Sequence, residues 1–488
     1  MARGMVANMR ISKKYWTLFY LLFCQMIIQG QSSLPDSLMD LPLSAPLVSV
    51  ESNNPAPFII GNIVIEGNKR TKSYIIEREI AFKRGDSVTL PALVQGFETS
   101  RQRLMNTTLF NDVVVALKSF RGYYVDIIIA VKERWYIFPI PYVKPVDRNL
   151  TEWATQGLGL DRVNYGFKFT YYNFTGRNDK LRLWLITGYT KQIQFQYEQP
   201  YADKNLKHGY KVGVAYAFNR EVNYQTIRNQ QHFVDTLSGT RRWNASIEYT
   251  YRPKIKTIHS FRLGFVHHEV DPEIITLNPK YFNTDENKIS YPEISYTLTY
   301  NNADYIPYPL TGWLAEASLL KRGLNSDVSM WQLGAKFTRA WRLANKTYFG
   351  WQGFGMIRLP FDQPFINQRM LGYSDLYVRG LEKYVIDGVA ATLWRHTLRY
   401  ELLKFSVPTF IQSRTHDEIP FRIYPKVFFD YGYVYNKYFT NNSLVNRPLY
   451  SAGFGIDVVT FYDFVLRLDY SFNQLGQNGL FLHLKNEF

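Results

Sequence analysis

The chain has 488 residues, more than one ordinary soluble domain, and combines 17% aromatic residues, among them 37 Tyr and 34 Phe, with a mean hydropathy of only −0.25. Abundant aromatic residues at low mean hydropathy are typical of strands in which apolar and polar residues alternate, as in a transmembrane β-barrel. The formal net charge of +16 is not accompanied by a basic run, a zinc ligand set or an RNA-binding motif, so we expect no nucleic-acid partner and attribute the charge to a solvated lumen or an anionic lipid surface.

The N-terminus has the pattern of a secretion signal. Four basic residues precede the apolar run 15–28, at Arg3, Arg10, Lys13 and Lys14, and IQGQSS offers a small-residue cleavage point near residue 30. The apolar run is short for a membrane-spanning helix, so we expect residues 1–30 to be cleaved rather than to remain as an anchor. Cys24, the only cysteine, lies in this segment, so the mature chain is expected to have no disulfide. Residues 31–57 are rich in Ser, Pro, Asn and Leu without any period, which predicts a flexible leader.

Residues 58–133 predict a small α+β domain with the element order β-α-α-β-β. Ile59, Ile63 and Ile65 mark the first strand, helices are expected at 72–80 and 90–106, and strands at 111–120 and 123–133. The core of this domain lacks His, Cys and paired carboxylates, so no catalytic or metal site is expected in it. The strand pair 112–118 and 123–131 could accept an added strand from a partner. A simple spacer is the alternative, and composition does not separate the two.

From residue 134 onward, segments of period-two alternation are separated by clusters of Gly, Asn, Asp and Pro. In one of them Trp243 and Ile247 fall on one face, and Asn244 and Glu248 on the other. We expect sixteen strands, near 134–146, 162–173, 179–190, 192–200, 209–219, 242–252, 259–269, 291–301, 313–322, 329–341, 347–358, 391–403, 421–436, 449–460, 463–473 and 480–488.

These segments have about the 9–11 residues that a tilted strand needs to cross a bilayer. In lipid only a closed barrel gives every strand edge a partner, and an even strand number is usual in bacterial barrels. The expected fold class is therefore membrane all-β: a sixteen-stranded antiparallel transmembrane β-barrel at 134–488, preceded by the small α+β domain. A soluble β-sandwich is the rival, but so many long strands with an aromatic face argue against it.

Several motifs resemble those of the outer-membrane protein assembly superfamily, the BamA/TamA type with POTRA domains and a sixteen-stranded barrel. FIIGNIVIEGNKRTKSYIIEREIAFKRGD, RQRLMNTTLFNDVVV and VDIIIAVKER together resemble one POTRA domain, which would lie in the periplasm. LYVRGLE resembles the family's VRG loop, and FFDYGYVYN the strand that this loop meets. KERWYIFPIPYVKPVDRNLTEW, at the start of the barrel, resembles a Bacteroidetes-like branch with a single POTRA domain. The resemblance covers about residues 58–488.

The resemblance also implies functional positions at strand ends. NNADYIPYPLTGW is similar to an Asp…Pro…Gly motif at the start of a barrel strand, here Asp304, Pro309 and Gly312. The final KNEF ends on Phe488, as an outer-membrane barrel signal does.

The VRG motif lies in a long segment, 359–390, that is expected to fold into the barrel and fasten to its wall. Alternation places Asp430 toward the lumen, and Glu401, which shares the parity of Arg399, toward it as well. We expect Arg379 to bind Asp430, with Glu401 as a second carboxylate, because a guanidinium can hold two carboxylate oxygens at once. Gly380 would let the backbone turn close against the wall.

The function that the resemblance implies is the insertion or export of client proteins through a laterally opening seam between the first and last strands. Pro139, Pro141 and Pro145 in the first strand fit this, because each proline removes a ladder donor and is tolerated at a sheet edge. Leu484 and Phe488 belong to the other side of the seam.

The expected partners are outer-membrane lipids and unfolded outer-membrane or secreted clients, with periplasmic chaperones or accessory lipoproteins as further possibilities. A single POTRA-like domain puts docking of accessory lipoproteins in doubt. The alternative functions are a passive outer-membrane pore and a dedicated two-partner-secretion-type transporter. An enzyme is not expected, since His267, His268, His396 and His483 have no partners at useful spacing, and neither a cofactor nor a metal is expected.

Overall fold

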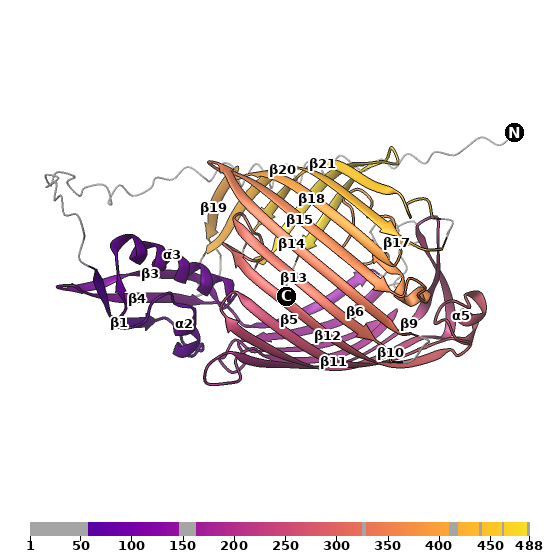
Figure 1. Cartoon of the computed structure of the whole chain (residues 1–488), viewed down its shortest axis with the longest axis horizontal. Helices are drawn as coiled ribbons and strands as arrows, with labels where there is room; N and C mark the ends of the chain where they lie inside the picture. The colour runs from indigo at the N-terminus through magenta and orange to yellow at the C-terminus, as the bar shows by residue number, and fades with distance from the viewer. Residues whose placement is uncertain are drawn as a thin grey trace, which may run out of the picture. The chain divides into compact units, whose positions relative to one another are not determined.

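The computed structural model describes residues 57–145, 163–324, 328–408, 418–438, 442–460 and 463–485. The expected signal segment at 1–30, the expected leader up to residue 56 and Phe488 lie outside these ranges. Within them the chain forms a small α+β domain, called the N-domain below, and a closed antiparallel β-barrel (Figure 1). Among the described residues, no helix has both the length and the apolar character needed to cross a membrane.

The N-domain is a four-stranded sheet with two helices packed on one face. Its elements are β1 (Phe58–Glu66), α2 (Ser73–Glu79), β2 (Ser87–Val88), α3 (Leu90–Asn106), β3 (Phe110–Arg121) and β4 (Tyr124–Glu133), in the sheet order β2-β1-β4-β3. Odd-numbered residues of β4, such as Val125 and Ile127, are fully buried in one apolar cluster with Ile76 of α2 and Leu104 of α3. Burial of this period-two face against the helices stabilises the domain.

The other face of the sheet carries a buried carboxylate, Asp126. It accepts hydrogen bonds from the backbone N–H of Asn62 at 2.7 Å, from the Ser119 hydroxyl at 2.9 Å and from Arg121 at 3.0 Å. These donors, the Asn62 N–H first, lower the pKa of the Asp126 carboxyl. The glycine at position 61 makes the approach possible, since a Cβ at Gly61 would lie 2.5 Å from Asp126 Oδ1.

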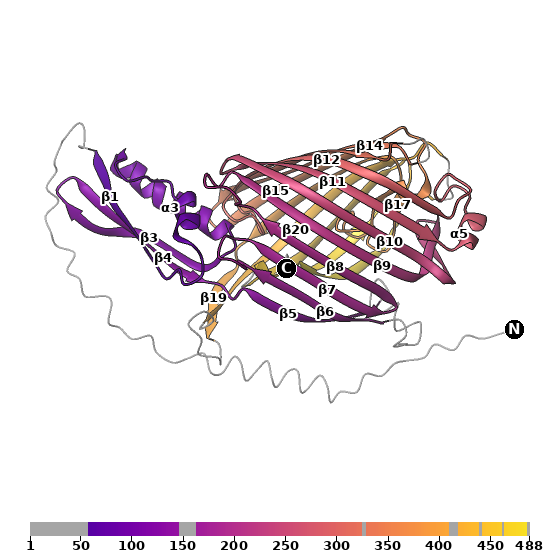
Figure 2. The same ribbon diagram turned by 90° about the horizontal axis from the view of Figure 1, so that it is seen from below.

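The barrel strands follow one another in chain order and incline to the barrel axis (Figures 1 and 2). They are β5 (Ile137–Pro145), β6 (Val163–Tyr172), β7 (Lys180–Gly188), β8 (Thr190–Gln199), β9 (His208–Ile227), β10 (Gln230–Lys254), β11 (Thr257–Val270), β12 (Lys288–Ala303), β13 (Gly312–Arg322), β14 (Met330–Ala344), β15 (Thr347–Leu359), β18 (Ala390–Tyr400), β19 (Leu403–Pro408), β20 (Glu418–Tyr435), β21 (Pro448–Val459), β22 (Val465–Asn473) and β23 (Asn478–Lys485).

β18 and β19 both pair with β20, at Arg399↔Lys426 and Leu403↔Ile423, and are two parts of one bent strand. With these two counted as one, sixteen strands close the barrel in the part of the chain that the structure describes, and β23 is the neighbour of β5. The predicted fold class is confirmed.

Side chains alternate along the barrel wall as the sequence predicts. In β10, Trp243 and Ile247 are 51% and 55% exposed on the outer surface, whereas Asn244 lines a cavity in the lumen. An outer surface of this kind suits contact with lipid.

The two ends of the barrel differ. At the end where the N-domain joins, called the N-domain end, the connections are turns such as 173–179, 200–207 and 304–311. At the other end, called the loop end, α5 (Pro272–Leu277) lies between β11 and β12 (Figure 1). The long connection 360–389 between β15 and β18 also starts there and contains η2 (Phe365–Asn367), β16 (Arg369–Leu371) and β17 (Ile386–Asp387).

Candidate functional site

The connection 360–389, called the inner loop below, is packed against the inside of the barrel wall. β16 and β17 pair as a short hairpin, at Arg369↔Asp387 and Leu371↔Ile386. Apolar residues of the loop, among them Leu371, Val378 and Leu381, share a buried cluster with wall residues Leu393 and Val434. The loop therefore has an apolar contact with β18 and β20 in addition to its polar ones.

The polar contact centres on Arg379 and Asp430, which is fully buried on β20. The Arg379 Nε donates to both Asp430 carboxylate oxygens, at 3.1 Å and 2.9 Å, and its Nη2 donates to Oδ1. The Arg379 backbone N–H donates to Asp430 Oδ2 at 3.0 Å, so main chain and side chain hold the same carboxylate. The Arg379 Nη1 donates to the Thr397 hydroxyl at 3.1 Å, and the guanidinium lies 4.0 Å from the centre of the Phe428 ring.

Gly380 brings the loop backbone close to β21 and β22. Its φ is +90°, and a Cβ there would lie 2.9 Å from the Ser471 Cβ. Its carbonyl accepts a hydrogen bond from the Asn473 amide at 2.7 Å, and its N–H donates to Glu382 at 2.6 Å. A side chain at this position would separate the loop from the wall.

Glu401 does not provide the second carboxylate that strand parity predicts. It lies in the break between β18 and β19, where its Oε2 accepts a hydrogen bond from Tyr424 at 3.0 Å. Thr397, which contacts Arg379, is four residues away, about 13 Å at the usual rise along a strand. The prediction is wrong for this residue because parity gives the face of a strand and not the height on that face.

The further charged group at this contact is a second arginine and not a second carboxylate. Arg395 on β18 places its Nε 3.9 Å from Asp430 Oδ2. Its Nη2 donates to the backbone carbonyl of Asp375 at 3.2 Å and to that of Tyr377 in the inner loop. One buried carboxylate thus serves two guanidinium groups, and the wall arginine also holds the loop backbone.

The Asp304, Pro309 and Gly312 motif shapes the turn between β12 and β13. Asp304 Oδ1 accepts hydrogen bonds from the backbone N–H groups of Leu310 and Thr311, both at 3.1 Å, and closes the turn on itself. Gly312 has a φ of +96°, and a Cβ there would lie 2.1 Å from the Asn302 carbonyl oxygen. The motif is therefore a backbone device and lies away from the inner loop.

The predicted seam residues lie on neighbouring strands. β5 carries Pro139, Pro141 and Pro145, and the side chains of Pro139 and Pro141 are exposed on the outer surface. Leu484 lies on β23, where it pairs with Leu466 of β22, and β5 is the neighbour of β23 on its other edge. Phe488 lies outside the described residues.

A second buried ionic cluster, which no motif predicted, lies nearer the N-domain end. Lys426 is buried, with its Nζ 2.5 Å from Asp457 Oδ1 and 2.7 Å from Asp469 Oδ1. Arg399 Nε is 3.8 Å from Asp457 Oδ2. Alternation could have found it, since Lys426 shares the parity of Asp430. Such a group is stable only when its charges are mutually paired.

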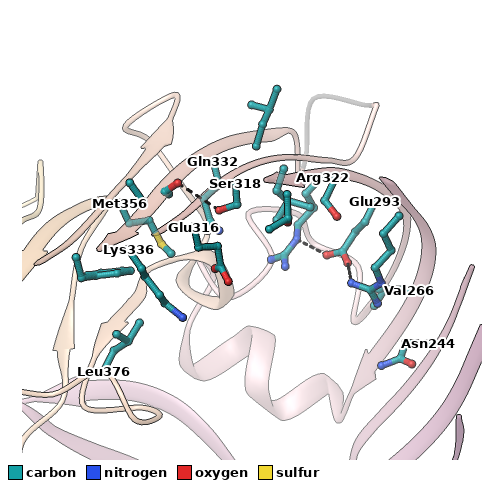
Figure 3. A pocket seen from close by; sticks show the side chains of 18 of the residues that line it. Asn244, Val266, Glu293, Glu316, Ser318, Arg322, Gln332, Lys336, Met356 and Leu376 are labelled. Carbon is teal, nitrogen blue, oxygen red and sulfur yellow. Dashed lines mark hydrogen bonds and ion pairs between the residues drawn. The ribbon is translucent and has the colours of Figure 1, made fainter. Parts of the chain in front are cut away.

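The lumen also contains a cavity of about 500 Å³, bordered by the wall from β10 to β15 and by Leu376 of the inner loop (Figure 3). Glu293 accepts a hydrogen bond from Arg322 at 2.9 Å and lies 4.0 Å from Arg262, whereas Lys336 extends along the opposite side (Figure 3). No group of three or more His, Cys, Asp or Glu side chains within the described ranges is placed to hold a metal ion. The site therefore consists of the contacts that hold the inner loop to the barrel wall, next to a polar cavity.

Comparison with known proteins agrees with this architecture. The Omp85 superfamily domain matches residues 173–380, and the surface antigen variable number repeat, a POTRA domain, matches residues 58–134. No protein of curated function matches the chain in sequence.

Solved structures of similar fold include BamA from Haemophilus ducreyi lacking POTRA domains 1–3, which is 17% identical over 88% of this chain and 84% of that chain, with a TM-score of 0.51. CdiB from Acinetobacter baumannii is 15% identical over 88% of this chain and 73% of that chain, with a TM-score of 0.44. CdiB from Escherichia coli is 10% identical over 99% of each chain, with a TM-score of 0.48. The chain therefore carries a POTRA domain followed by an Omp85 superfamily domain, on a closed barrel.

Proposed function

We propose that the protein inserts or exports other proteins at the outer membrane of a Gram-negative bacterium, through sideways opening of its barrel between β5 and β23. In this proposal the N-domain lies in the periplasm, receives unfolded client segments and passes them to the barrel. No covalent chemistry is involved. The Omp85 and POTRA domain matches support the outer-membrane setting and protein assembly or secretion-type transport as the broad task.

The observation that carries the proposal is the position of the prolines in β5. β5 pairs with β6 without a break from Ile137 to Pro145. In an antiparallel ladder, alternate residues direct their N–H groups to opposite neighbours. Pro139, Pro141 and Pro145 are all odd-numbered and have no N–H. The N–H groups of β5 in the unbroken ladder to β6 must therefore belong to the even-numbered residues between them. The three missing donors of the prolines therefore face β23.

All of these missing donors belong to β5, so only one of the two strands at the seam lacks N–H groups. Of the five odd-numbered residues of β5, from 137 to 145, only Ile137 and Val143 keep an N–H to offer β23. Each missing hydrogen bond removes about 0.5–1.5 kcal/mol of net stabilisation, and the facing carbonyls of β23 are left to find other partners. Opening at β5–β23 is therefore easier than at the strand pairs with full ladders, and an incoming client strand can donate to the freed β23 carbonyls.

The N-domain offers a sheet edge for the first contact with a client. In the described residues the sheet ends at β3, whereas β4 lies between β1 and β3 and has both edges paired. Strand addition is therefore expected along β3 and not along 123–131, which corrects the expectation that both strands take part. β2 at the other edge has only two residues, Ser87 and Val88. Main-chain hydrogen bonding to an edge strand tolerates many client sequences.

Depletion of the protein followed by quantitative proteomics of the outer membrane tests this function. Broad loss of barrel proteins is the expected result for a general insertase, and loss of one or two secreted or surface proteins for a dedicated transporter. An unchanged outer-membrane proteome would contradict both and leave a passive pore. Co-purification from crosslinked cells would show whether chaperones or accessory lipoproteins accompany the clients.

A further inference from the structure

The turn between β12 and β13, residues 304–311, is called the strap below because it reaches strands that are not its neighbours. β14, β15 and β18 lie between β13 and β20 in the barrel. Nevertheless Tyr308 of the strap is only 3% exposed, and its hydroxyl donates to Asp457 Oδ2 on β21 at 2.8 Å. Its ring centre lies 5.2 Å from that of Tyr424 on β20. The strap thus extends across the inside of the barrel at the N-domain end.

The contact of the strap with the far wall is both apolar and ionic. Tyr308 and Leu310 share a buried cluster with Tyr424, Val459 and Val465. The acceptor of the Tyr308 hydroxyl, Asp457, also holds Lys426 of the second ionic cluster. Arg399 lies 4.8 Å above the Tyr308 ring. The hydroxyl therefore ends in a charged, water-poor site, where a hydrogen bond is stronger than at the surface.

The N-domain holds the same strap from the other side. Asn106, the last residue of α3, accepts a hydrogen bond from the Ile306 N–H at 3.0 Å and donates to the Ala303 carbonyl at 3.2 Å. Both partners of Asn106 are main-chain groups at the start of the strap. The end of α3 therefore fixes the position of the strap whatever side chains the strap carries.

A shared carboxylate makes the second connection. Arg134, directly after β4, donates to both oxygens of Asp463, at 2.9 Å and 3.3 Å. The Tyr305 hydroxyl of the strap donates to the same carboxylate. Both Arg134 and Asp463 side chains are 8% exposed. Removing Arg134 would leave the buried Asp463 with the neutral Tyr305 hydroxyl as its remaining donor among the described residues, which weakens its hold on Tyr305.

We propose that the strap is a gate at the N-domain end of the lumen, and that movement of the N-domain releases it. The strap moves as a unit because Asp304 and Gly312 preset its shape. When α3 and Arg134 shift, the strap loses Asn106 and the Asp463 connection together, Tyr308 leaves Asp457, and the lumen opens toward the N-domain. The gate itself requires no client, whereas its use in handing over clients rests on the proposed function.

Accessibility of the lumen from the N-domain side tests the gate. A cysteine replaces Ser318, which lines the lumen cavity on β13, in a full chain that also carries Cys24→Ser. The protein is placed in liposomes with the N-domain outward, and a charged thiol reagent is added outside. With Tyr308→Phe, which keeps the ring and removes the hydroxyl, we expect the rate of modification to rise about tenfold, the population change that follows from losing one hydrogen bond to a charged group.

Arg134→Gln tests the connection to the N-domain and is expected to raise the rate similarly. The double variant should be little faster than either single one, because both changes release the same strap. Tyr281→Phe is the matched control: Tyr281 is 2% exposed and lies in the β11–β12 connection at the loop end, so its change should leave the rate as it is.

Equal rates in the parent and in Tyr308→Phe would overturn the gate. A faster modification rate in Tyr308→Phe but not in Arg134→Gln would overturn the proposal that the N-domain releases the gate. A faster rate in Tyr281→Phe would indicate general loosening of the barrel and would overturn the proposal as well. The assay contains no client, so it separates the two proposals: a gated lumen together with an unchanged outer-membrane proteome on depletion would retain the gate and discard the assembly function.

Discussion

Arg379 and Asp430 are joined by both the guanidinium and the backbone N–H of the arginine, so the inner loop is fixed to β20 in position and in direction. Asp430 is fully buried, and its second cationic neighbour, Arg395, also binds the loop backbone. The inner loop is therefore held by charged contacts at Asp430 and at its own backbone, within a larger apolar contact.

Loss of either partner should impair barrel assembly. Arg379→Ala leaves Asp430 with the more distant Arg395 alone, and Asp430→Ala leaves Arg379 without its carboxylate. Removing a partner from a buried ion pair costs roughly 3–5 kcal/mol where burial is deep, and less where lumen water or another charge compensates. Arg379→Lys should recover only part, because an ammonium cannot hold two oxygens in a fork. The measurement is the fraction of folded, heat-modifiable protein on gels and its urea midpoint.

The double variant should be little worse than either single one, since both remove the same interaction. Glu401→Ala is the control, because Glu401 contacts Tyr424 and not Arg379, and we expect only a small effect. Additive losses in the double variant, or an equal loss with Glu401→Ala, would mean that a different contact anchors the loop.

A covalent lock across the seam should stop function. Cysteines at Pro141 of β5 and near Leu484 of β23 are expected to form a disulfide that abolishes client assembly, with reductant restoring it. Pro141→Cys with Phe167→Cys is the matched control, because these two residues are directly paired between β5 and β6. Its disulfide should leave assembly intact. Full activity of the seam-locked protein would remove lateral opening from the mechanism.

Restoring the missing donors should strengthen the same seam without any crosslink. The triple change Pro139→Ala, Pro141→Ala and Pro145→Ala returns three N–H groups to the β23 side, each worth about 0.5–1.5 kcal/mol. We expect a higher unfolding temperature and slower client assembly. Pro292→Ala is the control. Pro292 lies in β12, which is not one of the two seam strands, so its change should leave assembly unchanged. Faster client assembly in the triple variant would contradict this prediction.

The edge of the N-domain sheet can be mapped with photocrosslinkers. At Val114 and Phe120 of β3, which are 49% and 57% exposed, crosslinks to unfolded client segments are expected. Val94 on α3 is 59% exposed and serves as the control, since it is as accessible but lies on a helix. Crosslinks at Val94 equal to those on β3, or crosslinks to lipid and barrel loops alone, would favour a spacer role.

The sequence by itself determined the fold class, because the period of a pattern depends only on neighbouring residues. Alternation at Trp243 to Glu248 defines which side of a strand meets lipid, and an exposed strand edge in lipid forces closure into a barrel. The VRG motif and Asp430 were also visible as local patterns, and so were the prolines of β5.

Distances across the lumen were decided only by the tertiary structure. Strand parity gave Glu401 the right face but not its height, because the break between β18 and β19 and the stagger of the strands set which rows lie level. The strap shows the same limit: Tyr308 and Asp457 are 149 residues apart, and nothing near either residue in the chain indicates the other. Contacts between strands far apart in the chain depend on barrel closure and on how far a turn extends inward, and neither is encoded in a local period.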